Sequence, residues 1–195
     1  MTDVLLEVRT SLREHFVGLG ITSEPDVASV TFLGVESIDV MRFGPEDGVL
    51  HYVSVGCSRH PMDEPTEMVH DNTGPRAEVV LSLRGPTPSG LVHSIAVLAA
   101  SPAIEGLVLV PDALIDLETP LWSGAPFTAV LLGVSGIGEV DLPPPLSPVT
   151  VLSATPITAT EAAWVRLKGA EAMREAWRVD GVDVLNPGRR ASQPS

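Results

Sequence analysis

The stretch "YVSVGCSRHPMDEP", residues 52–65, decides how the fold of this chain is read, because an apolar strand ends there and a polar segment begins. It holds the only cysteine of the chain, Cys57, with His60 three residues later and Asp63 and Glu64 beyond. These residue types can form a nucleophile with its base, a metal site, or a structural turn. The rest of the sequence decides among these three.

Length and composition predict a single folded domain. The chain has 195 residues, of which 44% are hydrophobic, enough to bury a sizeable core. No apolar run approaches the roughly 20 residues that a membrane span needs, and acidic and basic residues interrupt the amino-terminal apolar positions, unlike in a secretory signal. A single cysteine forms no internal disulfide, which fits a reducing compartment. We therefore predict a cytoplasmic protein that does not bind membranes.

The charge balance restricts the class of partner. The formal net charge is −13, from 12 basic and 25 acidic residues. Phosphate contacts need Lys and Arg, so this balance argues against nucleic-acid binding. It suits a basic protein partner, because opposite charges steer encounter. Solubility alone explains the charge equally well.

Hydrophobic periodicity predicts the first elements. A helix is expected over residues 3–19, because its apolar residues recur at spacings of three and four: Leu5, Val8, Leu12, Phe16 and Leu19. Runs rich in β-branched residues predict strands over 27–34, 49–57, 76–83, 127–135 and 149–157. The Ala-containing run over 91–102 favours a buried helix, and residues 58–75, with three prolines, are expected to form a long loop.

The last helix has the clearest start. Thr158 and Glu161 have the spacing of a capping box, in which each side chain bonds a backbone N–H of the helix start. One continuous helix is predicted to follow, with an apolar face made of Ala163, Leu167, Ala170, Met173 and Trp177. Gly169 inside it costs about 1 kcal/mol relative to Ala, which suggests a close packing contact. Residues 187–195 are expected to be a disordered tail.

The order of elements predicts an α+β fold. Most strands are neighbours in sequence, and helices lie at the two ends and once in the middle, so we expect a central mixed or antiparallel sheet with flanking helices. Residues 1–24 are expected to contribute the amino-terminal helix to the same domain, whose main part spans 25–186.

The reactive residues have alternative explanations. A catalytic Cys57 would need His60 within reach, but a lone cysteine at the end of an apolar strand is usually a small buried hydrophobe. The possible ligands His60, Asp63, Glu64, His70 and Asp71 match no compact zinc signature, and a solvated acidic loop explains them better. We therefore assign no catalytic residue, metal or cofactor.

Other motifs are also unspecific. "GVSGIG", residues 133–138, lacks the spacing of a nucleophile elbow, and the chain has neither a P-loop nor a dinucleotide fingerprint. Arg76 and Glu78 lie two positions apart on one strand face, where a structural ion pair is expected.

Four segments in order resemble the suppressor of fused family: "VSVGCSRHPM" (53–62), "RAEVVLSL" (76–83), "PFTAVLLGVS" (126–135) and "PITATEAAWVRLKGAEAM" (156–173). The residues that match the family pattern are Gly56, Ser58, Pro61, Met62, Arg76, Glu78, Pro156, Ile157, Thr158, Glu161 and Gly169. The resemblance covers most of residues 25–190. It implies a strand-terminating turn at 56–62 in which Cys57 occupies a variable position, which argues against catalysis.

The resemblance also implies a class of function. The animal member of the family is a protein-binding regulator, and stand-alone bacterial members look like immunity proteins that block a cognate toxin. We therefore predict a non-enzymatic protein-binding domain of immunity type, with a basic toxin as the partner that the charge suits. The predicted partner-binding residues are the loop carboxylates Asp63, Glu64, Glu67 and Asp71.

Two alternatives stay open. One is a small metal- or thiol-dependent enzyme that uses the 57–71 loop with Cys57, His60 and His70. The other is a module that self-associates through an exposed strand edge. The sequence leaves the oligomeric state open.

Overall fold

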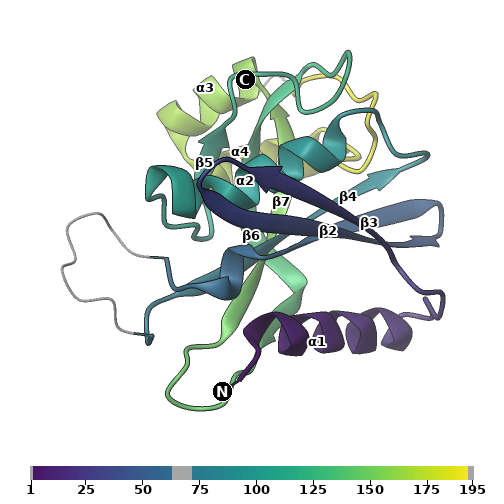
Figure 1. The fold of residues 1–195 in the computed structure, drawn as a ribbon. Helices are drawn as coiled ribbons and strands as arrows, with labels where there is room; N and C mark the ends of the chain where they lie inside the picture. Colours follow the sequence, from purple (N-terminus) through teal and green to yellow (C-terminus); the bar gives the residue numbers. More distant parts are fainter. Residues whose placement is uncertain (1, 63–71, 193–195) are drawn as a thin grey trace.

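The computed structural model describes residues 2–62 and 72–192, which form one seven-stranded mixed sheet with helices on both faces (Figure 1). The strand order is β1-β2-β3-β4-β7-β6-β5, in which β4 and β7 are parallel and all other neighbours are antiparallel. This arrangement confirms the predicted α+β fold. The strands are β1 (Asp26–Phe32), β2 (Val35–Glu46), β3 (Val49–Val55), β4 (Arg76–Arg84), β5 (Leu114–Asp116), β6 (Phe127–Val140) and β7 (Val149–Thr158).

Helices cover the two faces of the sheet differently. They are α1 (Val4–Gly18), α2 (Leu91–Glu105), α3 (Ala159–Lys168) and α4 (Ala170–Val179), with a short 3-10 turn η1 (Cys57–Arg59). α2 packs over one face, and Figure 1 shows α1 on the opposite side of the sheet. On β7, Val151 contacts the core under α1 and Ile157 the core under α3 and α4. Because alternate residues share a face, α1 and the α3–α4 pair cover two ends of the same face.

Two strands were not predicted. The sequence of β2, "VESIDVMRFGPE", contains several polar residues, which obscured its hydrophobic alternation. Ile38, Val40 and Phe43 are nevertheless buried. β5 has only three residues. β6 continues to Val140, five residues beyond the predicted end at 135. None of the described helices is both long and apolar enough to cross a membrane.

The predicted continuous last helix is wrong, because Gly169 divides it into α3 and α4. Gly169 has φ +93° and ψ 165°, a conformation open almost only to glycine. A Cβ built there would meet nothing within 4 Å, so backbone conformation and not close packing requires the glycine. Ala163 and Leu167 are consequently exposed, and the buried residues are Ala162, Val165, Ala170, Met173 and Trp177. The capping box of Thr158 and Glu161 is confirmed.

Candidate functional site

The turn after β3 is built around the buried carboxylate of Glu78 on β4. This carboxylate accepts hydrogen bonds from the backbone N–H groups of Gly56 (2.8 Å) and Ser58 (2.9 Å). It also accepts from the hydroxyls of Ser54 (2.5 Å) and Ser58 (2.6 Å). Burial raises the pKa of Glu78, and the hydrogen bonds only partly oppose that rise. The turn is therefore fixed by one acidic side chain from the neighbouring strand.

Gly56 is required at this turn for two reasons. Its φ of +142° lies where side chains are strained. A Cβ would also lie 3.0 Å from Cδ1 of Ile38 and 3.1 Å from the carbonyl oxygen of Ser37. The glycine therefore allows the turn to pack directly against β2.

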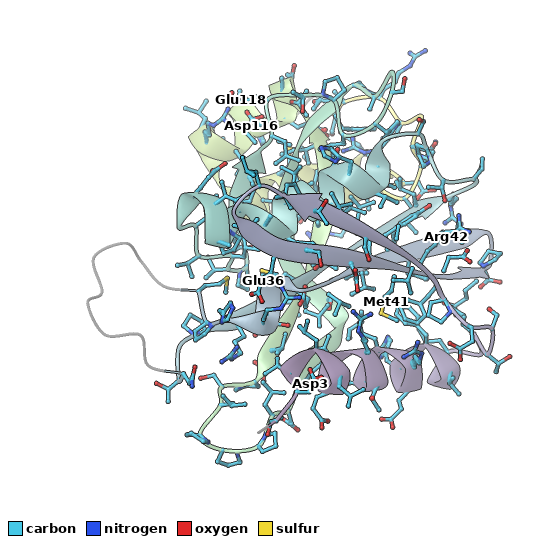
Figure 2. The ribbon with its side chains drawn as sticks, in the orientation of Figure 1. Asp3, Glu36, Met41, Arg42, Asp116 and Glu118 are labelled. Carbon is cyan, nitrogen blue, oxygen red and sulfur yellow. The ribbon has the colours of Figure 1, made fainter. Side chains whose placement is uncertain are left out.

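Cys57 and His60 occupy different environments. Cys57 is buried in the core under α2, and burial, followed by the proximity of Glu78, raises the pKa of its thiol well above the usual value. The His60 side chain is 73% exposed, and its Nε2 lies 2.8 Å from the carboxylate of Glu36, which Figure 2 labels. A thiol-dependent mechanism needs a thiolate, which this burial disfavours. The predicted burial of Cys57 is confirmed.

The ion pair expected between Arg76 and Glu78 is wrong. The Arg76 guanidinium is buried and donates instead to the carbonyl oxygens of Ser58 (2.8 Å), Arg59 (2.9 Å) and Asn72 (3.4 Å). Glu78 and Arg76, both on β4, thus bind the same turn. Glu78 accepts hydrogen bonds from the donors of the turn, and Arg76 donates to its carbonyl oxygens. This division of partners explains why a carboxylate and a guanidinium two positions apart do not meet.

Met62 and Asn72 are the described ends of the segment that carries the predicted partner-binding residues. The N–H of Met62 donates to the carbonyl oxygen of Pro75 (2.7 Å), and the buried Met62 sulfur accepts from the N–H of Leu109 (3.3 Å). Pro61 lines a small hollow next to Cys57. The predicted residues Asp63, Glu64, Glu67 and Asp71, together with His70, lie outside the described residues. The structure therefore describes only the base of this loop.

A hollow of about 330 Å³ lies beside that base. Residues of three segments line it: Thr2 and Val4 near the amino terminus, Arg59, Asn72 and Arg76 of the loop base, and Pro143–Leu146. The parallel pairing of β4 with β7 brings these segments together, because both strands start at this end. Ser147 accordingly donates a hydrogen bond to the carbonyl oxygen of Thr73.

The second buried carboxylate, Glu161, holds the carboxy-terminal segment. It accepts from Nη1 and Nη2 of Arg189 (both 3.0 Å), from Nε1 of Trp177 (2.8 Å) and from the N–H of Ser192 (3.2 Å). Burial opposes its ionisation, but the bonds from Arg189, Thr158 and Trp177 outweigh it and lower the pKa of Glu161. Residues 187–192, which the sequence assigned to a disordered tail, therefore include two buried residues, Arg189 and Ser192.

No sequence pattern pointed to Arg189 as a buried residue. Its guanidinium lies 4.9 Å from the centre of the Phe127 ring and 5.4 Å from that of Trp177, and it also donates to the carbonyl oxygen of Pro156 (2.8 Å). Pro156 and Glu161, two residues of the family pattern, thus both accept hydrogen bonds from one arginine of a polar segment.

Most of the Lys and Arg side chains form ion pairs with described carboxylates. Counting only carboxylates in residues 2–62 and 72–192, nine of the twelve Lys and Arg side chains lie within 4 Å of one: Arg9, Arg13, Arg42, Arg59, Arg84, Arg166, Arg174, Arg178 and Arg189. Exposed carboxylates such as Glu14, Asp47 and Glu118 have no ion pair with any residue in 2–62 or 72–192. Figure 2 shows Asp3 and Glu118 at opposite ends of the molecule. The outer surface is therefore predominantly acidic.

A hollow of about 310 Å³ lies on the sheet face that α1 shares with α3 and α4. Phe16, Leu19, Val134 and Leu185 give it an apolar lining, and Ser82, Ser153 and Thr155 add hydroxyl groups at its floor. It has the size of one or two side chains. In the described part of the chain, no three His, Cys, Asp or Glu side chains gather closely enough to hold a metal ion.

The comparisons with known proteins place these features in one family. The family model for suppressor of fused protein (SUFU) matches residues 34–190. No curated protein matches the sequence. Among solved structures, a protein from Neisseria gonorrhoeae FA 1090 described as a SUFU homologue is similar, with a TM-score of 0.68 and 16% identity over 96% of both chains.

Two further structures have the same fold. The Sufu–Fu complex matches with a TM-score of 0.69 and 16% identity, over 96% of this chain and 91% of that chain. Drosophila Suppressor of Fused matches with a TM-score of 0.67 and 16% identity, over 94% of this chain and 50% of that one. At this identity the likeness concerns the fold.

Proposed function

This chain belongs to the suppressor of fused family, and on that premise we propose that it is a protein-binding domain of immunity type, which covers and blocks a basic toxin. One similar structure is a complex of Sufu with the protein Fu, so the fold can present a protein-binding surface. The proposed site of action is the cytoplasm, and the proposed partner is neither nucleic acid nor a membrane.

The distribution of charge carries this proposal. Carboxylates of the described residues hold nine of the twelve cations in ion pairs, and the chain has 25 acidic residues in all, so a partner meets mainly carboxylates. An acidic surface raises the association rate of a basic protein and disfavours acidic ones. A basic toxin is therefore the class of partner that the surface suits.

We place the centre of the binding surface at the loop that carries Asp63, Glu64, Glu67 and Asp71. These four carboxylates fall within nine residues of sequence. Glu78 and Arg76 fix the turn before the loop, and the bond from Met62 to Pro75 joins its two stems. The points at which the chain enters and leaves the loop are therefore held by hydrogen bonds.

A binding function also fits the chemistry of the turn. The buried Cys57 thiol has a raised pKa, and the exposed His60 bonds Glu36. The enzyme alternative would need both residues at one reacting atom. We therefore propose no catalytic residue and no cofactor.

The first experiment recovers the protein with its bound partners from the source organism at low ionic strength. We expect a basic protein in equal molar amount, which inhibits growth when produced alone and becomes harmless when produced with this chain. A recovered partner that is acidic, or that is harmless alone, would contradict the toxin assignment.

A pair of matched variants then tests the surface. The loop variant carries Asp63→Asn, Glu64→Gln, Glu67→Gln and Asp71→Asn, and the control variant carries Glu14→Gln, Glu24→Gln, Asp47→Asn and Glu118→Gln. Both remove four negative charges. An exposed ion pair contributes about 0.2–1 kcal/mol, so the loss of four should raise the Kd of the loop variant at least about fourfold, and the control should change much less. Equal effects would show long-range attraction without a defined site.

A further inference from the structure

The strand β1 leaves one long edge of the sheet open. β1 pairs with β2 on one side, and in the part of the chain that the structure describes no strand pairs with its other side. Its first four residues are exposed, and the Val27 side chain is exposed to 48%. Natural edge strands are usually protected by Pro, Lys or a bulge. The sequence of β1, "DVASVTF", contains neither Pro nor Lys.

The open edge of β1 also has no net charge, although the formal net charge of the chain is −13. Asp26, its one acidic residue, pairs with Arg42 of β2, which Figure 2 labels. Asp39, which faces Ser29 across β1 and β2, accepts hydrogen bonds from Ser29 and from Arg9 of α1. Two copies of this edge can therefore approach without the repulsion expected between two acidic surfaces.

We propose that two copies of this chain pair antiparallel through β1, about a two-fold axis at Ser29. Ser29 is the middle of the seven residues of β1, so this register pairs the whole strand with its equivalent. Val27 of one copy then faces Thr31 of the other, and Ala28 faces Val30. The two sheets join into one continuous sheet across the axis. The inference is independent of the proposed toxin partner.

A hollow beside β1 agrees with this register. It measures about 200 Å³, and Asp26, Ala28, Val40 and Val92 line it on the face that α2 covers. Phe32 packs on that same face. In the proposed register Phe32 of the second copy lies opposite Asp26, and directly opposite residues share a face. The aromatic ring therefore arrives next to the hollow.

The irregularity at the end of the strand does not disturb this register. Val30 pairs with Ile38 and Phe32 with Val35, so one β1 residue lies opposite two β2 residues. The extra residue of the bulge is on β2, and β1 itself stays regular up to Phe32.

Two double variants test the register by charge. Val27→Lys with Thr31→Lys places like charges opposite each other at both ends, whereas Val27→Lys with Thr31→Glu places opposite charges there. We expect sedimentation equilibrium to give twice the 20.5 kDa chain mass for the natural protein at high micromolar concentration. The Lys/Lys variant should dissociate at least about tenfold more readily, and the Lys/Glu variant should remain a dimer. Circular dichroism checks that both variants fold.

Other outcomes overturn the inference. A natural protein that stays monomeric at the highest concentration excludes the dimer. Dimerisation of both variants with the affinity of the natural protein excludes β1 as the interface. A dimer that is weakened equally by both variants excludes the register centred on Ser29.

Discussion

Two glutamates of the family pattern are buried, but their ionisation is shifted in opposite directions. Glu78 receives hydrogen bonds from neutral donors, and burial raises its pKa. Glu161 forms an ion pair with the guanidinium of Arg189, and this arginine together with the other donors lowers the pKa of Glu161. At the residue scale, the charge of the partner therefore decides how each glutamate couples stability to pH.

For Glu78, the folded state binds a proton more tightly than the unfolded state between the ordinary pKa of 4.5 and the raised folded value. Its contribution to stability is therefore full below pH 4.5 and falls as pH rises through the folded pKa. Glu78→Gln has no such titration, so we expect the stability difference between the natural protein and this variant to shrink from pH 4.5 to pH 7.5. Urea unfolding at both pH values measures it. A constant difference would contradict the raised pKa.

For Glu161 the sign reverses. Its lowered pKa makes the contribution full above the ordinary value of 4.5 and lost as pH falls through the folded pKa. We expect Glu161→Gln to cost more at pH 7 than at pH 3, in the same urea measurement. An equal cost at both pH values would show that the carboxylate acts only through its shape.

Arg189→Met should lower the free energy of unfolding by about 3–5 kcal/mol, because it leaves the Glu161 carboxylate buried without its cation. Adding Glu161→Gln to this variant should recover part of the loss, since the uncompensated charge is removed. Thermal unfolding of the single and double variants measures this coupling. Additive losses would show that the two side chains do not interact.

At the scale of elements, Gly169 separates two helices that the hydrophobic pattern had joined. A continuous helix predicts that Gly169→Ala stabilises by about 1 kcal/mol. The observed φ of +93° predicts the opposite, a loss of about 1–3 kcal/mol, because alanine is strained there. Denaturant unfolding decides between the two signs. Leu167→Ala serves as a control and should change stability little, because Leu167 is exposed.

Elements with a strong local pattern were predictable, and those that depend on distant partners were not. α1 and the capping box at Thr158 have signals within one or two turns of helix. β2 is held between β1 and β3, and its polar residues obscured its alternation. The break at Gly169 was missed because apolar residues on both sides also fit one continuous helix.

At the scale of the whole molecule, α1 belongs to the core although the family model begins only at residue 34. Val8, Leu12 and Phe16 are buried against β2, β3 and β7, and Phe16 stacks on Phe43 with ring centres 4.2 Å apart. This packing supports our proposal that residues 1–24 are part of the same domain. The sequence indicated the buried face of α1 but not the surface that receives it.

Phe16→Ala should therefore destabilise the entire fold, by about 3–5 kcal/mol, and leave a single unfolding transition. Hydrogen exchange of α1 and of β4 should then accelerate by the same factor. Faster exchange in α1 alone would show that the helix detaches before the sheet unfolds. Leu6→Ala is the matched control on the exposed face of the same helix.

The candidate site is formed by side chains from distant parts of the sequence, and no local pattern reveals that they come together. The sequence identified Gly56, Ser58, Arg76 and Glu78 as a group, but it predicted an ion pair where the structure has a turn bound by both side chains. Ser54 and Arg189 were missed because their partners lie 24 and 28 residues away. The hollow that Phe16 and Leu19 of α1 line together with Val134 and Leu185 could not be predicted, because the sequence does not show which segments share a face of the sheet.

The positions of the two chain ends have a practical consequence for attaching this protein to a surface. Thr2 and Val4 border the hollow at the base of the 63–71 loop, whereas Ser192 is held beside Glu161, and Figure 1 shows the ends on opposite sides of the molecule. A bead or fluorophore linked to the amino end would crowd the proposed toxin-binding surface. The same group linked to the carboxy end would leave that surface facing the solution, so binding sensors built on this domain should be tethered there.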